Sequence, residues 1–444
     1  MLKALANIFK IADLKKKVLF TIGLIAVYRI GAFIPTPGID GRALAQFFDN
    51  IARTQGGTLF GLMNMFTGGA MQRMTIFALG IMPYISASII LQLLTVVIPQ
   101  LEKLAKEGGE IGRRTLTQYT RYGTVGLCIV QSLFISMWLE NPAHFQGIRI
   151  VQVTGWPFRL LTILTLTTGT TFIMWLGERI TEKGIGNGIS LIITAGIISR
   201  APAAFYQLYI LLSKGQIEIL TAVLMVVMLV GVIAGVIMIT QGQRRIPVQY
   251  ARRIVGRRVY GGQSTYIPLR VNQAGVIPII FAQSIILFPA TIASLIPAGV
   301  IQKLANLLVP GNVAYELFYA VLIIFFCYFY TAIAFNPVDV ADNMKRYGGF
   351  VPGIRPGRPT AVHLDYIMSR ITLSGAAFLA IIAIMPHFVS RGFRIPYLVA
   401  SFFGGTGLLI IVGVILDTMK QIESQLLMRH YEGFMKKGKL RGRR

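Results

Sequence analysis

Hydrophobic and polar positions divide this chain into long apolar runs separated by short polar or basic segments. Ten runs approach the length that crosses a bilayer, about 20 residues. They lie near 18–35, 74–98, 119–139, 156–176, 185–204, 217–239, 272–296, 315–336, 371–388 and 396–416. The pattern predicts an all-α polytopic membrane protein with ten transmembrane helices.

A shorter apolar segment, Leu59 to Phe66, precedes the second span. It is too short to cross a bilayer and too apolar to lie bare in water. Irregular backbone persists at membrane depth only inside protein or beside a water-filled cavity. We therefore expect a re-entrant helix at about 59–71 that fills a pore; a surface helix along the headgroups is the alternative. The candidate plug residues are Leu59, Phe60, Leu62, Met63, Asn64, Met65 and Phe66.

Composition and charge sharpen this interpretation. Of the 444 residues, 54% are hydrophobic and 14% are charged, whereas soluble domains carry about 25% charged residues. Lys and Arg are concentrated in the N-terminal arm, in the loops after spans two, four, six and eight, and in the tail. This bias predicts that both termini are cytoplasmic. No cleavable signal is visible, and the cysteines, Cys128 and Cys327, give no disulfide framework.

A long basic loop after the sixth span suggests two pseudo-symmetric halves of five spans, 1–214 and 215–444. The second half then holds cytoplasmic loops at about 241–271 and 338–370 and a basic tail at 420–444. Many transport folds contain inverted repeats. The halves show no convincing sequence self-similarity, so the repeat is an analogy.

Isoleucines recur at glycine-flanked positions in the second, fifth, seventh and tenth spans. Some are four residues apart and share a helical face, and glycine lets neighbouring helices approach closely. An isoleucine in a span commonly faces lipid or packs in a core. Four close-packed helices can, however, surround an apolar constriction that blocks ions by dewetting. The candidate pore ring is Ile81, Ile85, Ile189, Ile193, Ile280 and Ile410.

Amide and hydroxyl side chains occur within the second and seventh spans. Such groups are costly in hydrocarbon and turn toward partners or water. Contact between helices is one explanation. A seam between the two spans that parts for a passing segment, a lateral gate, is the other. The candidate gate residues are Ser86, Gln92, Asn272 and Gln283.

Two predicted cytoplasmic loops are rich in arginine. Residues 241–270 hold seven arginines and no acid, with a hairpin tip expected at 259–262, and residues 345–360 are rich in Gly and Pro. Basic loops set topology, but these are longer than that role needs. Arginine pairs suit carboxylate or phosphate partners, such as an acidic protein surface or ribosomal RNA, and the basic tail also suits anionic lipid. The candidate docking residues are Arg244, Arg245, Arg252, Arg253, Arg257, Arg258, Arg355 and Arg358.

The sequence lacks the motifs of common catalytic sites. No HExxH, GxSxG or Walker-type phosphate loop is present, so we expect neither an enzyme nor a cofactor or metal site. A proton- or sodium-driven transporter usually keeps an acidic residue at mid-membrane, and no predicted span has one. Such a transporter is the first rival interpretation, which binding of a small solute would support. A scaffold without a pore is the second, and it would tolerate charged replacements at Ile81 and Ile193.

Six stretches closely resemble the bacterial SecY family, the channel subunit of the Sec protein-conducting translocon. The resemblance covers essentially the whole chain, and these stretches are its most specific parts, in the family's order. They are RIGAFIPTPGID (29–40), FALGIMPYISASII (77–90), GIGNGIS (184–190), QRRIPVQYARR (243–253), AGVIPIIFA (274–282) and FVPGIRPG (350–357).

The resemblance implies two halves hinged around an hourglass pore, with a plug from Leu59 to about Met71 and the six isoleucines at the narrowest point. Spans two and seven, with parts of three and eight, would form the lateral gate for signal sequences. The basic loops would dock ribosomes and the SecA motor ATPase, with Arg355 as a critical residue. SecE and SecG would be small membrane partners. The implied function is a passive channel for unfolded secretory polypeptides in the bacterial cytoplasmic membrane, which also releases transmembrane segments into lipid.

Overall fold

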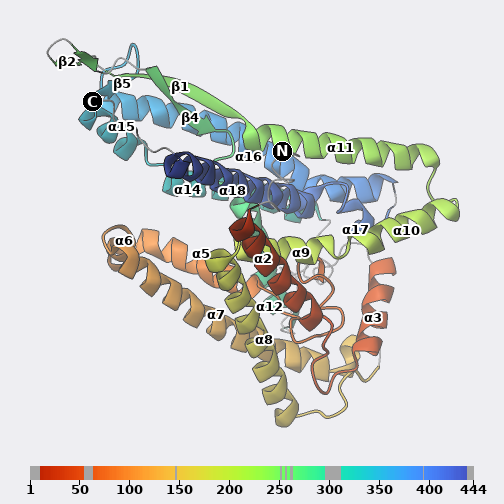
Figure 1. Cartoon of the computed structure of the whole chain (residues 1–444). Helices are drawn as coiled ribbons and strands as arrows, with labels where there is room; N and C mark the ends of the chain where they lie inside the picture. Colours follow the sequence, from red (N-terminus) through yellow and green to blue (C-terminus); the bar gives the residue numbers. More distant parts are fainter. Residues whose placement is uncertain are drawn as a thin grey trace.

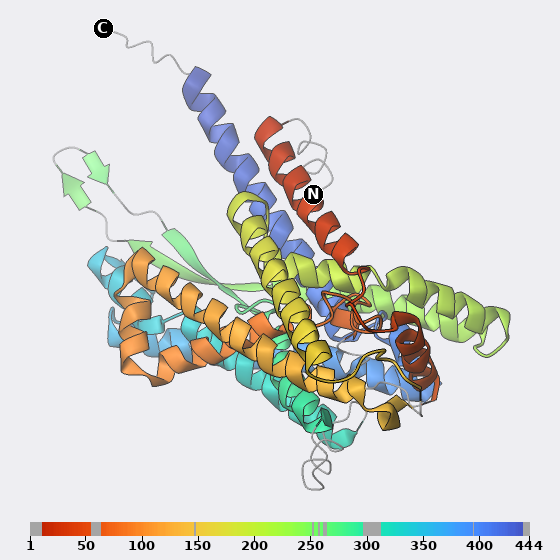
Figure 2. The same cartoon turned by 90° about the horizontal axis from the view of Figure 1, so that it is seen from below.

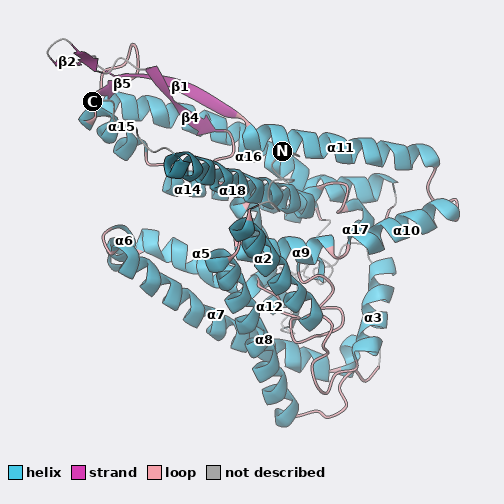
Figure 3. Cartoon of the chain, viewed as in Figure 1, coloured by secondary structure: helices cyan, strands magenta, loops and turns pink. Residues whose placement is uncertain are grey.

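The computed structural model describes residues 11–54, 64–145, 148–250, 253–255, 258–260, 264–295, 312–393 and 395–437. In these residues the protein is mostly helical, with a small β region at one end (Figures 1 and 3). The earlier helices are α2 Ala12–Gly31, α3 Gly41–Thr54, α5 Met82–Val97, α6 Pro99–Lys106, α7 Gly109–Glu140, η1 Pro142–Phe145, α8 Trp156–Lys183, α9 Gly188–Ile198 and α10 Ala201–Ser213. The later helices are α11 Ile219–Gln241, α12 Ile277–Leu295, α14 Val313–Ala334, α15 Pro337–Arg346, α16 Arg358–Phe393, α17 Tyr397–Ala400 and α18 Gly405–Lys437. The strands are β1 Gln243–Tyr250, β2 Arg253–Val255, β3 Arg258–Tyr260, β4 Ser264–Arg270 and β5 Gly349–Phe350.

Among the described residues, 7 helical segments are long and apolar enough to cross a membrane. They are Gly109–Glu140, Trp156–Lys183, Gly188–Ser213, Ile219–Gln241, Val313–Arg346, Arg358–Phe393 and Gly405–Met428. The pair α5 and α6, bent by 102° at its break, makes an eighth if it is one span. α2 is not in this set, and it carries three lysines at 15–17 as well as Arg29. The apolar part of α12 that qualifies by composition, Ile277–Ile286, is too short.

The second predicted span begins later than its hydropathy indicates. We expected a helix from residue 74, but α5 starts at Met82 and residues 76–81 form turns. Met74 and Gly80 have φ angles of +46° and +58°, which a right-handed helix does not accommodate. Pro83 lies in the first turn of α5, where its missing N–H is not needed. Local backbone geometry therefore sets this helix boundary.

The predicted hairpin tip at 259–262 is also wrong. β2 pairs with β3 in an antiparallel hairpin, and Val255 lies opposite Arg258. The chain therefore reverses between these two residues, before the expected tip.

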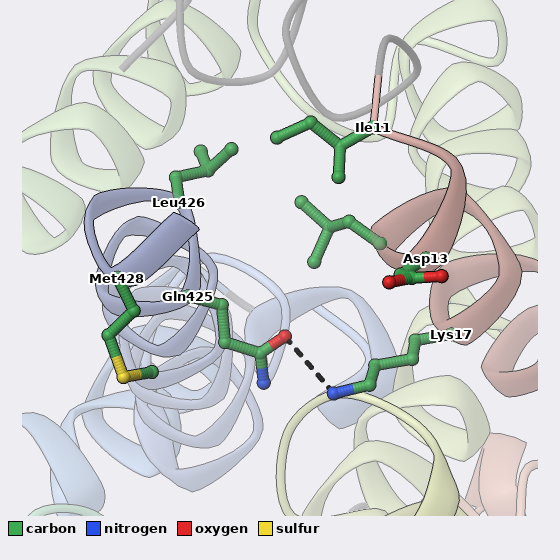
Figure 4. A pocket seen from close by; sticks show the side chains of 7 residues that line it. Ile11, Asp13, Lys17, Gln425, Leu426 and Met428 are labelled. Atoms are coloured by element: carbon green, nitrogen blue, oxygen red, sulfur yellow. Dashed lines mark hydrogen bonds between the residues drawn. The ribbon is translucent and has the colours of Figure 1, made fainter. Parts of the chain in front are cut away.

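One large apolar core connects most of the long helices, from α2 to α18. The first and last of them lie side by side (Figure 2). Lys17 Nζ donates to Gln425 Oε1 at 3.4 Å across a cavity of about 220 Å³ between α2 and α18 (Figure 4). Leu14 lies in a small apolar cluster with Ile185 and Ile422. The start of α2 and the end of α18 therefore lie at the same end of the helix bundle.

Candidate functional site

The six candidate ring isoleucines lie in one apolar core where α5, α9, α12 and α18 meet. Five of them are at most 6% exposed, and Ile189 is partly buried against the same cluster. α5 contacts α12, α12 contacts α18, and α18 contacts α9. The fold therefore places isoleucines from four separate parts of the chain in the same large apolar core.

Glycines allow the helices around this core to approach closely. A Cβ atom on Gly188 of α9 would clash with the carbonyl O of Gly177 in α8, and one on Gly413 of α18 would clash with Val276. Asn187 caps α9 by accepting hydrogen bonds from two backbone N–H groups at 3.1 and 3.3 Å. The sequence motif GIGNGIS thus positions one wall of the isoleucine core through a tight contact and a helix cap.

The described part of the candidate plug, Asn64 to Phe66, lies between α9 and α18. Asn64, Met65 and Phe66 are buried. Met65 Cε lies 2.9 Å from a Cβ built on Gly407 of α18, and the Phe66 carbonyl O lies 2.6 Å from one built on Gly196 of α9. The remaining candidates lie outside the described residues; they are Leu59, Phe60, Leu62 and Met63.

The buried turns that follow this segment have paired backbone groups. Asn64 Nδ2 donates to Gln72 Oε1, and the Gln72 backbone N–H donates to Asn64 Oδ1, both at 3.0 Å. The Thr36 backbone N–H donates to the Met74 carbonyl at 3.0 Å. This arrangement satisfies irregular backbone inside the protein, as is required at membrane depth.

The candidate gate residues lie on α5 and α12 or just before α12, but two of them have polar neighbours on α14. Ser86 and Gln283 are buried. Gln283 Oε1 on α12 accepts a hydrogen bond from Tyr319 Oη at 2.8 Å. Gln92 Nε2 on α5 donates to Ser88 Oγ of the same helix at 3.5 Å, and its amide lies near the hydroxyl of Tyr330 on α14. This last contact therefore joins α5 to α14.

Asn272 has a local role, since its Nδ2 donates to the Gly275 carbonyl at 3.0 Å just before α12. Among the side chains that the structure describes, no hydrogen bond or ion pair joins α5 directly to α12. Sequence reasoning missed Tyr319 and Tyr330, because α14 is rich in aromatic residues and its apolar pattern does not distinguish them. The available signal was that the amides of Gln92 and Gln283, if buried, each need a hydrogen-bonding partner.

The two predicted docking loops pack into one platform at the end of the molecule (Figure 1). β1 and β4 from the first loop form a sheet with β5 from the second, and Gln249 lies opposite Phe350. The sheet packs on α15 and α16 through a separate apolar core that includes Ile246 and Leu364. A shared core fixes the two loops relative to each other, so they present one surface.

Arginines lie on the exposed parts of this platform. Arg244 and Arg245 are exposed on β1, and the Arg245 guanidinium lies 4.7 Å from the centre of the Tyr266 ring. Arg355 and Arg358 are exposed where the second loop enters α16. For the other candidates, only the backbone of Arg253 and Arg258 is described, in β2 and β3, and Arg252 and Arg257 lie outside the described residues.

Comparisons with known proteins identify the family. The sequence profile of the SecY family matches residues 75–419. The chain is 50% identical over 436 residues to protein translocase subunit SecY of Escherichia coli K12, covering 97% of this chain and 96% of that one. The chain belongs to the SecY family. The SecY subunits of Aquifex aeolicus and Streptomyces coelicolor are 44% and 50% identical, each covering 98% of this chain and 100% of their own.

Solved structures show the same fold. A structure of a protein-conducting channel superposes with a TM-score of 0.64 at 18% identity, and Sec61 in a canine ribosome-channel complex with 0.61 at 17%, each covering 92% of both chains. The fold is therefore the SecY/Sec61 channel fold. SecY family membership confirms that the chain is a multi-pass membrane protein, a channel subunit of a protein translocase and not an enzyme.

Proposed function

We propose that this chain is a passive, gated channel that passes unfolded secretory polypeptides across the bacterial cytoplasmic membrane and releases transmembrane segments laterally into lipid. The observation that carries the proposal is that the six isoleucines belong to one buried core and lie on, or at the start of, four helices linked by contacts of α5 with α12, α12 with α18 and α18 with α9. An apolar constriction blocks ions by dewetting and needs no charged gate. The energy comes from a partner, since the sequence has no nucleotide-binding motif.

In the proposed closed state, residues 59–71 act as a plug beside the ring. Support comes from Met65 and Phe66, which pack in the same core as the isoleucines. A similar solved structure, with a TM-score of 0.61 at 18% identity, is of a SecY protein whose plug domain stabilises the closed state and maintains a membrane seal. We assign the same role to the corresponding segment of this chain.

The proposed lateral gate lies between α5 and α12, with parts of α7 and α14. The helices contact each other through apolar side chains, and such a contact can be replaced by an apolar signal sequence or by lipid at little cost. The approach of the Gln92 amide on α5 to the Tyr330 hydroxyl on α14 is a polar contact across this gate. A signal sequence that enters the seam would separate α5 from α14 and free both side chains for polar groups of the passing segment.

We propose ten spans in two halves, 1–214 and 215–444. The bent pair of α5 and α6, together with α2 and α12, completes ten when added to the 7 long apolar segments. The boundary falls at Lys214 and Gly215, in the turn between α10 and α11. Both termini would be cytoplasmic, as indicated by the basic segments and by the contact between the start of α2 and the end of α18.

The platform of β1, β4, β5 and α15 is the proposed docking surface for the SecA motor and for the ribosome, including its RNA. Two similar solved structures are ribosome-bound complexes, and exposed arginines suit phosphate and carboxylate partners. SecE and SecG are the proposed small membrane subunits, and signal sequences, nascent chains and membrane lipids complete the set of partners.

Photo-crosslinking tests the channel proposal. A crosslinking residue is placed at Ile81, Ile193 and Ile410, and at the exposed controls Leu164 and Leu220, and a secretory chain is then stalled during translocation. We expect adducts at the three isoleucines and none at the controls. Adducts at the controls alone, or none anywhere with the partners present, would contradict the proposed pore and favour the transporter.

Charge reversal at Arg355 tests the docking surface. Arg355→Glu replaces an exposed side chain, so the unfolding temperature should be unchanged, while motor-driven secretion falls by about tenfold, as for loss of a charged contact worth 1–3 kcal/mol. The measurement is translocation of a secretory precursor into vesicles. Arg42→Glu, also exposed but far from the platform in the sequence, is the matched control. Normal secretion by the Arg355 variant would remove this residue from the docking surface.

A further inference from the structure

Arg29 in the last turn of α2 has no role in the ring, the gate or the platform. Charged side chains within spans are costly and commonly serve a function. Arg29 Nη1 donates to the carbonyl O of Gly68 at 3.4 Å. A Cβ on Gly68 would lie only 2.5 Å from the same nitrogen. The guanidinium therefore lies directly against the glycine turn that follows Phe66.

The neighbour of Arg29 contacts the same turn. Tyr28 Oη donates to the Thr67 carbonyl at 3.4 Å, and Tyr28 is 2% exposed. Its ring stacks on Phe77 at 6.0 Å between centroids, and Phe77 stacks on Phe172 of α8 at 6.1 Å. This stack fixes the end of α2, so the two side chains that reach the turn project from a rigid position.

The turn itself is closed against α9. Gly68 and Gly69 have φ angles of +64° and +91°, a conformation that glycine adopts without strain. A Cβ on Gly68 would lie 2.9 Å from Ser199 Oγ and 3.0 Å from Gly196 Cα. Gly68 therefore lies between Arg29 on one side and the end of α9 on the other.

We propose that Arg29 is a positioning residue that holds the 67–69 turn against α9 and thereby keeps Met65 and Phe66 seated between α9 and α18. A hydrogen bond from a charged donor is strong where water is excluded and weak where the donor is hydrated. Arg29 and Gly68 are half-buried, so the anchor loosens when more water or a polypeptide reaches them. The sealing effect of the seated segment rests on the proposed function, whereas the anchor itself does not.

The test measures how accessible position 65 is. Met65→Cys is made in the full chain with Cys128→Ala and Cys327→Ala, reconstituted in liposomes, and labelled with a membrane-impermeant maleimide while ion leak is recorded. Arg29→Met should increase the labelling rate by about tenfold, as expected for loss of a charged hydrogen bond, and should raise the leak. Arg29→Lys, which keeps the charge, should give an intermediate rate.

Arg73→Met is the matched control, because Arg73 and Arg29 lie over the same aromatic ring. The Arg73 guanidinium is 5.1 Å and the Arg29 guanidinium 5.5 Å from the centre of the Phe33 ring. This control should label at the parent rate. An unchanged labelling rate in Arg29→Met, or an equal increase in the Arg73 control, would overturn the anchor. Faster labelling without added leak would support the anchor and overturn the sealing role in the proposed function. If Arg29→Met does not fold, Arg29→Lys and Tyr28→Phe answer the same question, and parent rates in both overturn the anchor.

Discussion

The α7–α8 pair and the α5–α12 pair both join neighbouring long helices, but different forces hold them together. At one end of the first pair, Arg121 makes two hydrogen bonds to Glu178, at 3.0 and 2.8 Å. At the other end, Glu140 forms an ion pair with Arg159 at 2.6 Å and accepts from the Gly155 backbone N–H at 2.7 Å. The contact between α5 and α12 is apolar in the described residues.

This difference shows where the molecule can open. Parting the partly buried Glu140–Arg159 pair leaves each ion without its partner, which is unfavourable, whereas the more exposed Arg121–Glu178 pair contributes less. Parting two apolar helix faces in a membrane costs little when lipid or an apolar segment replaces the lost contact. The α7–α8 pair is therefore suited to move as one rigid unit, and the α5–α12 contact is suited to be the seam.

The largest effect should follow from removing the ion pair at the end of α7. Glu140→Leu leaves Arg159 and the Gly155 N–H without their acceptor, and we expect the free energy of unfolding to fall by about 3 kcal/mol. Urea or thermal unfolding in detergent, followed by helical signal, measures the loss. Arg114→Ala is the control, because its ion pair with Glu110 is exposed on both sides and should contribute about 0.5 kcal/mol or less. Equal losses in the two variants would show that α7 and α8 are not held by Glu140.

A smaller loss of stability is expected from breaking the contact between α12 and α14, which lie on the same side of the seam. Gln283→Leu removes the acceptor for Tyr319 Oη, a bond that joins α12 to α14. Stability should fall by about 1–2 kcal/mol because a buried hydroxyl is left unpaired. α12 and α14 lie on the same side of the proposed gate, so this hydrogen bond does not hold the gate closed. A large rise in ion leak from this variant would contradict that assignment.

Part of this organisation was predictable from the sequence and part was not. Isoleucines next to glycines carry a local signal, since close approach and a shared helical face follow from spacing alone. The contact of Arg29 with Gly68 crosses 39 positions, and no local pattern identifies that carbonyl as its acceptor. The sequence showed a charge within an apolar span, which predicts that a partner exists but does not say which.

Backbone geometry explains the errors in element boundaries. The run from residue 74 is as apolar as a helix, and its turns depend on positive φ angles at Met74 and Gly80 that hydropathy does not record. The hairpin was expected at two adjacent glycines, Gly261 and Gly262, whereas strand pairing places the reversal before Arg258. The sequence also did not predict that the two arginine-rich loops share one sheet. Their pairing depends on a two-residue strand, β5, about 100 positions after β1.

The smallest loss of stability, and the sharpest test of the comparison, concerns a tyrosine that reaches across the seam. Tyr330→Phe removes the hydroxyl that faces the Gln92 amide of α5 and should lower the free energy of unfolding by about 1 kcal/mol. Tyr328→Phe, two residues earlier on α14, removes the bond to the Ser369 carbonyl at 2.9 Å, which joins α14 to α16 on one side of the gate.

The two variants should therefore lose similar stability, but only Tyr330→Phe should ease opening of the seam. The measurement is the yield of lateral insertion of a weakly apolar signal sequence. The yield is compared among the two variants and the parent at equal protein amounts. A higher yield from Tyr330→Phe alone means that the polar contact of Tyr330 with Gln92 across the seam biases the gate toward closure. Equal yields from the two variants would mean that apolar contact between α5 and α12 sets that bias without help from polar groups.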